Sequence, residues 1–311
     1  MKIAVVGRLG IDLVAAVDRL PRPGETVPSR GFAREPGGTG TLQAIAAARL
    51  EGDVAVYGCV GLDPFGSEIL ALLTEERIHT EGVAKAQDAP TGASLVLVGP
   101  NRNYLAAHAS GANEKLDEAY VERHLPRIRE ADAVLLDLAL PVLALRALLG
   151  GLSSSCSVVA SHPLLRDSAF PWEGVDYLVG TRDEFLQAGP SSGGLDDAAR
   201  ASQVFLDRGA RNIVVVAGAD GTYLVEKGGV TRFPGHGQPA ADPSSTVDGF
   251  SAALAARLAA GRGLYEAVGF ATAAIALSAT RSSSGPASLP TSAEVVAFLA
   301  RLSPHPGRSA A

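Results

Sequence analysis

Short apolar runs alternate with amphipathic stretches along most of the chain. Apolar runs rich in β-branched residues and bounded by glycine or polar residues are typical of buried strands. They lie at Lys2–Val6, Asp53–Val60, Ala133–Leu138, Ser157–Ala160, Tyr177–Val179 and Asn212–Ala217, and a hairpin is predicted at Gly221–Val225 and Gly229–Phe233. Apolar residues three or four positions apart predict helices at Leu42–Leu50, Pro64–Arg77, Asp117–Arg129, Val142–Leu149, Leu195–Arg208, Asp248–Ala260, Leu264–Ala279 and Ala293–Leu302. This order predicts an α/β fold with a mostly parallel central sheet covered by helices on both faces.

Two segments depart from this alternation. Val14–Phe32 alternates apolar and polar residues, and Ala93–Val98 and Tyr104–Ser110 form two strands joined by a turn. We expect them to pair as a small β-sheet lid. We therefore expect a single domain over 1–311, with a lid from about 13–36 and 90–112. The core would comprise 1–12, 37–89 and 113–303, and 304–311 would be a disordered tail.

Composition narrows the class of protein. The chain has 311 residues, of which 47% are hydrophobic and 19% charged, so it is globular. Its net charge of −6 gives no reason to expect nucleic-acid binding. No run of about 18 apolar residues predicts a membrane span. Two cysteines cannot form a disulfide framework, so we expect a reducing, cytoplasmic setting.

The stretch 241–261 carries the main candidate for chemistry. Asp248 directly precedes an apolar helical stripe, so the sequence predicts that it lies in the first turn of a helix. Unpaired amide groups there can bind an anion. A carboxylate beside a phosphate site suits a general base that deprotonates a hydroxyl. The alternative is that Asp248 only caps the helix.

Other polar candidates lie near expected strand ends and loops. Asp12 follows the first strand, where ligands of open α/β sheets bind, although a carboxylate there also stabilises turns. The glycines of 37–40 precede a helix and let a ligand approach the backbone, or serve only the loop. His162 and His236 lie in expected loops without paired metal-ligand spacing, so a solvated role is expected for both.

Several blocks in a fixed order resemble one family. They are VVGRLGIDLVAAVDRLPRPGETV near the start, PGGTGTLQAIAAARL, VGLDPFG, PTG at 90–92, GAN at 111–113 and DPSSTVDGF at 242–250. Together they resemble the ribokinase, or phosphofructokinase-B, family of carbohydrate and nucleoside kinases. The resemblance covers nearly the whole chain. It implies a ribokinase-like three-layer α/β/α sandwich with a lid over the site.

The resemblance also implies roles for individual residues. Asp248 takes the position of the catalytic base, and Asp12 that of a residue binding a substrate hydroxyl. Gly37 and Gly38 match the double glycine under the substrate. The implied cofactors are ATP and Mg²⁺, and the implied partners are a small hydroxyl acceptor and a second copy of the chain, paired through the lid.

The phosphate side departs from the family pattern. Ser245, Thr246 and Val247 replace a Gly-Ala-Gly whose amide groups close around the transferring phosphate, and β-branched residues resist glycine-only conformations. In the Asn-x-x-Glu motif, Thr181 replaces the asparagine, while Glu184 is kept and implied to act on magnesium through water. Gly218 is kept from the nucleotide-side Thr-x-Gly.

The acceptor side departs as well. Thr39 and Leu42 replace the lysine and asparagine that follow the double glycine, Gly10 replaces an asparagine, and Ala139 replaces a glutamate that contacts the sugar. A site that hydrogen-bonds hydroxyls discriminates through such groups, so ribose is not expected as the acceptor. Asn103, at the lid tip, is either a substrate contact or an exposed turn residue.

Two functions remain open on the sequence. The first is an ATP-dependent kinase that phosphorylates a hydroxyl of a sugar, nucleoside or sugar-like acceptor. The second is a protein of this fold that binds a metabolite, or acts in a biosynthetic pathway, without ATP turnover. Retention of Asp248, Asp12 and Glu184 favours the first, and the Ser245–Val247 replacement favours the second.

Overall fold

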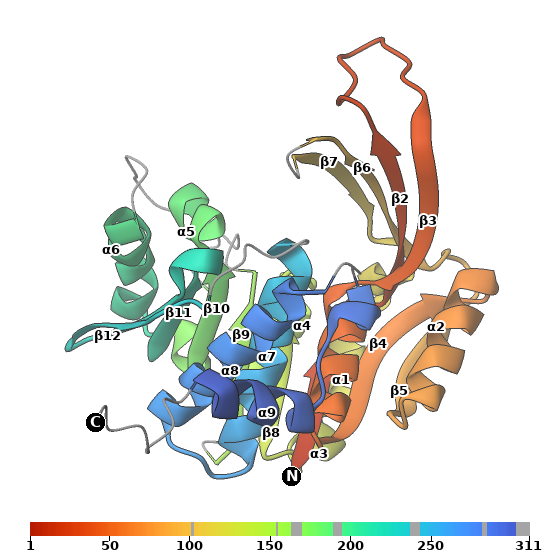
Figure 1. Ribbon diagram of the computed structural model, residues 1–311. Coiled ribbons are helices and arrows are strands. Elements are labelled where there is room, and N and C mark those ends of the chain that lie inside the picture. The colour runs from red at the N-terminus through yellow and green to blue at the C-terminus, as the bar shows by residue number, and fades with distance from the viewer. Residues whose placement is uncertain are drawn as a thin grey trace.

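A nine-stranded sheet forms the centre of the molecule. The computed structural model describes residues 1–100, 103–153, 155–162, 170–188, 195–236, 243–281 and 285–302. The strand order of the sheet is β13-β12-β11-β10-β9-β8-β1-β4-β5, and Figure 1 shows helices on its two faces. The strands are β1 (Lys2–Val6), β4 (Asp53–Gly61), β5 (His79–Ala86), β8 (Ala133–Asp137), β9 (Ser157–Ser161), β10 (Tyr177–Thr181), β11 (Asn212–Val216), β12 (Thr222–Glu226) and β13 (Gly229–Phe233). All neighbours pair in parallel except β11–β12 and β12–β13.

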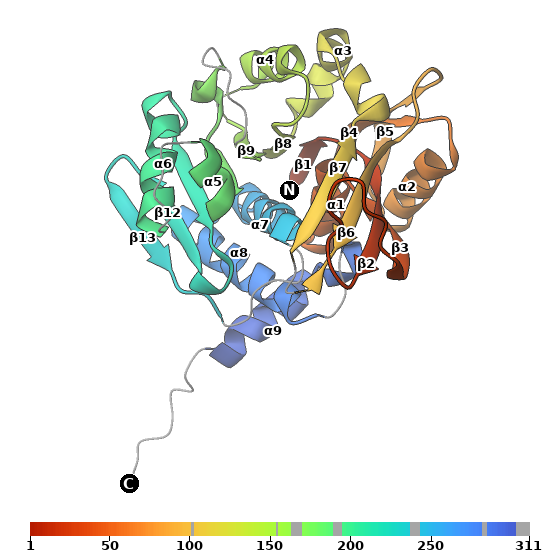
Figure 2. The same cartoon turned by 90° about the horizontal axis from the view of Figure 1, so that it is seen from above.

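Two apolar layers enclose this sheet. Successive strand residues point to opposite faces, and in β1 Ile3 and Val5 belong to one buried cluster whereas Ala4 and Val6 belong to the other. The first cluster includes residues of α1 (Thr39–Arg49), α2 (Pro64–Glu75), α7 (Pro243–Ala259), α8 (Leu264–Ala279) and α9 (Ser292–Leu302). The second includes residues of α3 (Glu118–Ile128), α4 (Val142–Gly151), α5 (Arg182–Ala188) and α6 (Leu195–Asp207). The helices are therefore split between the two faces, as Figure 2 shows from above.

A second, four-stranded sheet projects from the end of the molecule at which α1 begins (Figure 1). Its order is β3-β2-β6-β7. The strands are β2 (Gly10–Val17), β3 (Ser29–Gly37), β6 (Gly92–Val98) and β7 (Tyr104–Ala109). β2 pairs in parallel with β6, while β2–β3 and β6–β7 are antiparallel. The predicted fold class, a three-layer α/β/α sandwich with a small second sheet, is confirmed.

Two elements were not expected from the sequence. The edge strand β5 has only two buried residues, so its sequence HTEGVAKA carries little apolar signal. The seven-residue helix α5 is too short to show helical periodicity. Within the described part of the chain, no helix is long and apolar enough to cross a membrane.

Candidate active site

The carboxyl edge of the central sheet gathers the polar side chains. Arg8 follows β1, Asp137 ends β8, His162 follows β9 and Thr181 ends β10. Because these parallel strands end at one edge, the side chains converge there. The helices α1 and α7 pack against each other beneath them. The result is one polar cluster built from segments far apart in the sequence.

The helix that carries Asp248 begins earlier than the sequence predicted. α7 starts at Pro243, so Asp248 lies in its second turn, and the prediction of a first-turn position was wrong. Proline is favoured at the first helical position, and the residues that follow it contain no glycine before Gly249, so helical geometry continues through them. The amide groups of Val247 and Asp248 therefore bond to carbonyls four residues earlier. The anion site expected at Val247–Gly249 is not formed by those amides.

The start of α7 still offers donors on the same side as Asp248. The amides of Ser244 and Ser245 have no acceptor within the helix, and Pro243 has no N–H. Ser244 and Asp248 are four positions apart and share a helix face. Side chains lean toward the helix N-terminus, so the Asp248 carboxylate leans toward these amides.

Asp248 is a buried carboxylate. It is 2% exposed, and its Oδ1 accepts a hydrogen bond of 3.1 Å from Nε2 of Gln43 in α1. The same Nε2 donates to Oγ of Ser161 at 2.9 Å. Burial raises the pKa of Asp248 to about 6, despite the contacts with His162 that act to lower it. The group is thus placed to exchange a proton near neutral pH.

His162 lies inside the cluster and not in a solvated loop, which corrects the expectation from sequence. Its Nδ1 is 2.9 Å from Oε1 of Glu184, and its Nε2 is 3.2 Å from Oγ1 of Thr39 and 3.7 Å from Oδ1 of Asp248. Burial alone would lower the pKa of His162, but the contacts with Asp248 and Glu184 outweigh it and raise the pKa to about 10. Its backbone φ is +66°, a strained value that clusters at functional sites. His236 instead lies edge-on to the ring of Phe298, with the ring centres 5.9 Å apart.

Glu184 is held from two sides. Its Oε2 accepts from the amide of Thr181 at 2.7 Å, and its own amide donates to Oγ1 of Thr181 at 3.1 Å. This reciprocal pair is a capping box at the start of α5. Burial would raise the pKa of Glu184, but hydrogen bonding to His162 and Thr181 lowers it. Glu184 is therefore ionised and fixed, with a structural role in addition to any role at magnesium.

The cluster also contains an ion pair, Arg8–Asp137, that the sequence did not indicate. Nε of Arg8 donates to Oδ2 of the fully buried Asp137 at 2.7 Å, and Nη2 of Arg8 donates to Oγ1 of Thr39 at 3.2 Å. The Ala139 amide donates to Oδ1 of Asp137 at 3.0 Å. Burial would raise the pKa of Asp137, but the charges of Arg8 and His162 and the hydrogen bonds from Arg8 and Ala139 together lower it. The charges of the two candidate carboxylates Asp12 and Asp248 also contribute to the raised pKa of Arg8.

The glycines bring the backbone close to these groups. A side chain at Gly37 would start 2.4 Å from the carboxyl group of Asp12, so only glycine fits beneath that carboxylate. Gly38, with φ +83°, lies before α1, and a side chain there would start 2.7 Å from the Arg8 carbonyl oxygen. The double glycine thus serves the packing of Asp12 and of the loop after β1.

The remaining candidates lie in varied places. Leu42 and Val247 are buried, Thr246 is 7% exposed, and Ala139 is exposed next to the ion pair. Ser245 lies in the first turn of α7, and its side chain is outside the described residues. Gly218, with φ +59°, opens a short 3₁₀ turn after β11.

Asn103 is not brought to this cluster. It lies at the turn between β6 and β7, where its amide donates to the Pro100 carbonyl at 3.4 Å. β6 begins at Gly92, which pairs with Gly10 near the core, and Val98 lies about 20 Å further along the strand. Asn103 is therefore an exposed turn residue in this structure.

The comparisons with known proteins agree with this architecture. A family profile described as pfkB family carbohydrate kinase matches residues 1–292. The chain belongs to the pfkB family of carbohydrate kinases. The ribokinase of Haemophilus influenzae is 28% identical over 301 residues, 96% of this chain and 98% of the relative. The ribokinase of Bacillus subtilis is 28% identical over 288 residues, 89% of this chain and 92% of the relative.

Solved ribokinases share the fold of this pfkB-family chain. The crystal structure of the Thermotoga maritima ribokinase superposes with a TM-score of 0.84 at 28% identity, covering 96% of this chain and 99% of that one. The Arabidopsis thaliana ribokinase, complexed with ribose and ATP, superposes with a TM-score of 0.82 at 23% identity, covering 96% and 98%.

The donor set fits a nucleotide phosphate and, through water, its magnesium ion. The amides at the start of α7, which have no acceptor within the helix, suit an anion. Among the described residues, no group of three or more His, Cys, Asp or Glu side chains is placed to hold a metal ion directly. Mg²⁺ commonly keeps several waters and is bound through phosphates and few carboxylates. Glu184 fits such an outer position, because both of its oxygens already accept hydrogen bonds.

Proposed function

We propose that this chain transfers the γ-phosphoryl group of ATP to a hydroxyl of a sugar-like small molecule. The observation that carries the proposal is the placement of Asp248. Its buried carboxylate, with a pKa raised to about 6, lies one helical turn from the amides at the start of α7, which have no acceptor within the helix. We place the acceptor beside Arg8 and Asp12, because the charges of both Asp12 and Asp248 act on Arg8. A base and an anion site so close together suit phosphoryl transfer to an alcohol.

In this mechanism, bound Mg²⁺·ATP supplies the transferable phosphoryl group and neutralises part of its charge. Asp248 accepts the proton of the acceptor hydroxyl as the hydroxyl oxygen bonds to phosphorus, and ADP leaves. Asp12 and Arg8 bind and orient the acceptor. The amides of Ser244 and Ser245 would hold the phosphate charge, and Glu184 would hold magnesium through water. His162 sets the spacing between Glu184 and Asp248.

We do not propose free ribose as the acceptor, because the site lacks side-chain hydrogen-bonding groups that the family pattern implies for ribose. Leu42 is buried and apolar, and Ala139 offers no side-chain hydrogen bond. The hydroxyl of Thr39 already contacts Arg8 and His162. The polar groups left for an acceptor therefore differ from those that the family pattern implies for ribose.

A second candidate function is ligand binding without ATP turnover. The observation that favours it is His162, which contacts Glu184 and lies 3.7 Å from Asp248, between the magnesium side and the base. In that case the protonated imidazole would supply the positive charge that a metal ion brings in a kinase.

Acceptor-dependent release of ADP separates the two functions. We would incubate the protein with Mg²⁺·ATP and a panel of sugars, nucleosides and aminocyclitols. Turnover with any acceptor supports the kinase. Binding of acceptors without ADP release, and without binding of ATP measured by calorimetry, supports the second function.

The small sheet is proposed to act as a lid and as a dimer contact. Its face turned away from the site exposes Phe32, Leu95 and Leu105, by 70%, 59% and 49%. Strand pairing brings these side chains into two adjacent rows. Exposed apolar patches of this kind favour association. Sedimentation of the wild type and of Leu95→Lys tests this: a dimer that dissociates in the variant supports the contact.

A further inference from the structure

One side chain of α1 joins three elements beside the candidate base. Gln43 is fully buried, and its Nε2 donates a hydrogen bond of 2.9 Å to Oγ of Ser161 and one of 3.1 Å to Oδ1 of Asp248. Ser161 ends β9 directly before His162, and Asp248 lies in α7. A single amide group therefore ties α1 to the strand end that carries the imidazole and to the helix that carries the carboxylate.

The other end of the same amide has no partner. Oε1 of Gln43 is buried and accepts no hydrogen bond from the described residues. Turning the amide over would bring Oε1 against the ionised oxygen of Asp248, which repels it. Burying an unpaired amide oxygen costs free energy. An apolar side chain of similar size would avoid that cost, so stability alone does not explain a glutamine at this position.

The hydrogen bond from Gln43 acts on one particular oxygen of the base. It is made to Oδ1 of Asp248, and Nε2 of His162 lies 3.7 Å from that same oxygen. A hydrogen bond to one carboxylate oxygen resists rotation of the group about the Cβ–Cγ bond. With Oδ1 held in this way, Oδ2 is the oxygen that can be aimed at an acceptor.

Charged groups set the proton affinity of Asp248 together with this bond. Burial raises the pKa of Asp248, the contacts with His162 and the charge of Arg8 lower it, the charge of Asp137 raises it, and the result is about 6. Glu184 contacts the opposite side of the His162 ring. The amide of Gln43 carries no charge, so it acts only by hydrogen bonding, which favours the ionised carboxylate. Its removal should therefore raise the pKa of Asp248 further.

We propose that Gln43 is the positioning residue of the base: it holds Oδ1 of Asp248 so that Oδ2 faces the acceptor hydroxyl. The hydroxyl proton moves to Oδ2 as the hydroxyl oxygen bonds to phosphorus and ADP leaves, while Nε2 of Gln43 stays bonded to Oδ1. Gln43 touches neither the acceptor nor the phosphate and acts through Asp248. This inference deepens the proposed function and rests on it for the transfer step.

Two variants of the same helix form a matched pair. Gln43→Met removes the amide and keeps an unbranched, adaptable side chain. Thr41 is equally buried and its Oγ1 has no partner among the described residues, so Thr41→Val also replaces a buried polar group by an apolar one. Gln43→Asn shortens the side chain by one methylene and provides the same test should Gln43→Met not fold.

Two measurements are made on each protein. NMR of the aspartate carboxyl carbons follows the titration of Asp248, whose signal is identified by its absence in Asp248→Asn. Acceptor-dependent ADP release gives kcat, KM and the pH profile of kcat/KM. Gln43→Met is expected to raise the Asp248 midpoint and the acidic limb of kcat/KM by about one pH unit. It should lower kcat about tenfold and change the acceptor KM by less than about threefold.

The control and the titration keep the outcomes apart. Thr41→Val is expected to keep the wild-type midpoint and kcat. An unchanged Asp248 midpoint in Gln43→Met overturns the inference, and so does an equal loss of kcat in Thr41→Val. A shifted midpoint with wild-type kcat at high pH also overturns the positioning role. If the wild type releases no ADP with any acceptor, the proposed function fails, and the titration still decides whether Gln43 holds the Asp248 carboxylate.

Discussion

Nε2 of His162 lies 3.7 Å from Oδ1 of Asp248, while Nδ1 of the same ring lies 2.9 Å from Oε1 of Glu184. One imidazole thus connects the candidate base on α7 with the capping-box carboxylate on α5. The ring reaches both because the His162 backbone takes a φ of +66° directly after β9. The spacing of the two carboxylates therefore depends on a residue that belongs to neither helix.

Removing the imidazole tests this positioning role. His162→Asn keeps a residue that tolerates positive φ, whereas His162→Ala does not, so the alanine variant should be less stable by about 1 kcal/mol. Both should lower kcat more than they raise KM, because the base and Glu184 lose their spacing but the acceptor contacts remain. Urea unfolding and steady-state kinetics measure these effects. Unchanged kcat in His162→Asn would contradict the role.

The raised pKa of Asp248 predicts the pH dependence of turnover. The base accepts a proton only when ionised, and burial raises its pKa to about 6. Consequently kcat/KM should be level above about pH 7 and should fall about tenfold per pH unit well below pH 6. Initial rates across pH, with stability checked at each pH, provide the measurement. A level profile down to pH 5 would exclude this assignment.

The Arg8–Asp137 pair predicts asymmetric mutational costs. Asp137 is fully buried, so Arg8→Met leaves its carboxylate without the guanidinium partner. This should lower the free energy of unfolding by about 3–5 kcal/mol. Asp137→Leu should cost less, because the partly exposed Arg8 can reach water. The double variant Arg8→Met/Asp137→Leu should recover part of the stability that Arg8→Met loses. Urea unfolding of all four proteins gives the coupling energy, and a cost below about 1 kcal/mol for Arg8→Met would contradict the pairing.

The same pair gives a pH prediction. Arg8 keeps the pKa of Asp137 below its unfolded value, so the stability it contributes is present above the unfolded pKa and is lost as pH falls through the folded pKa. In Arg8→Met the buried carboxyl binds a proton more readily. The penalty of that variant should therefore be smaller at pH 5 than at pH 8.

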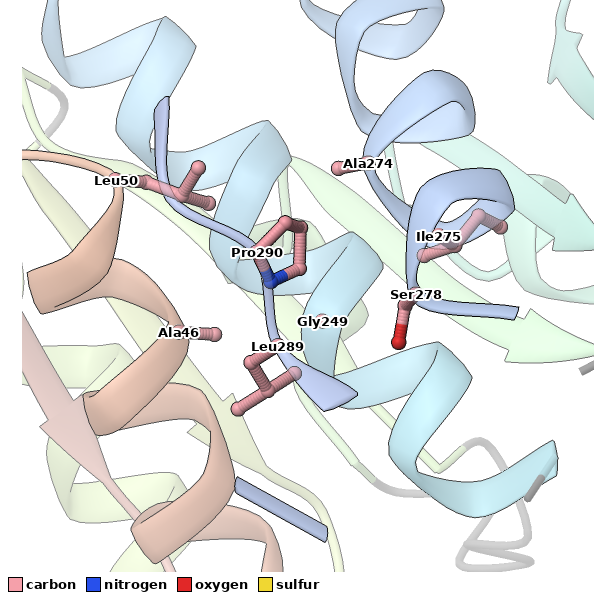
Figure 3. A pocket seen from close by; sticks show the side chains of 8 residues that line it. All are labelled: Ala46, Leu50, Gly249, Ala274, Ile275, Ser278, Leu289 and Pro290. Carbon is pink, nitrogen blue, oxygen red and sulfur yellow. The ribbon is translucent and has the colours of Figure 1, made fainter. Parts of the chain in front are cut away.

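Gly249 offers a gain in stability next to the candidate base. It lies inside α7 and borders a small apolar pocket lined by Ala46, Leu289, Pro290 and neighbours (Figure 3). A methyl group there would lie 3.3 Å from Cδ2 of Leu289, whose end can shift into the pocket. Gly249→Ala should stabilise the fold by about 0.5–1 kcal/mol through helix propensity.

Gly269 in α8 provides the matched control for this change. A methyl group at Gly269 meets only Cδ1 of Phe233, at 3.9 Å, so Gly269→Ala reports propensity without crowding. A gain in the control together with a loss in Gly249→Ala would mean that Leu289 cannot move.

Local sequence signals predicted much of the fold but only part of the site. Strand runs and helical spacing follow from neighbours in sequence. Asp12, expected in the turn after the first strand, instead lies inside β2 of the small sheet. Two further local signals were available. Pro243 marks a first helical position, and Thr181 with Glu184 forms a capping-box pattern. Using them would have placed the start of α7 and the structural role of Glu184.

The polar cluster itself needed the tertiary structure. Arg8 and Asp137 are 129 positions apart, and Gln43 and Asp248 are 205 apart. Neither pair carries a local pattern. The direction of the His162 side chain depends on its positive φ, which the neighbouring residues in the sequence do not predict. Which residues of the small sheet share a face likewise depends on the register between β2 and β6.

The most direct test of the kinase assignment is acceptor-dependent ADP release by Asp248→Asn beside the wild type. The variant keeps the shape of the side chain but cannot accept the hydroxyl proton. With an accepted substrate, kcat/KM should fall by about 10²–10⁴-fold, while calorimetry should give unchanged ATP binding. Wild-type turnover that persists in Asp248→Asn would contradict the assignment of Asp248 as the base.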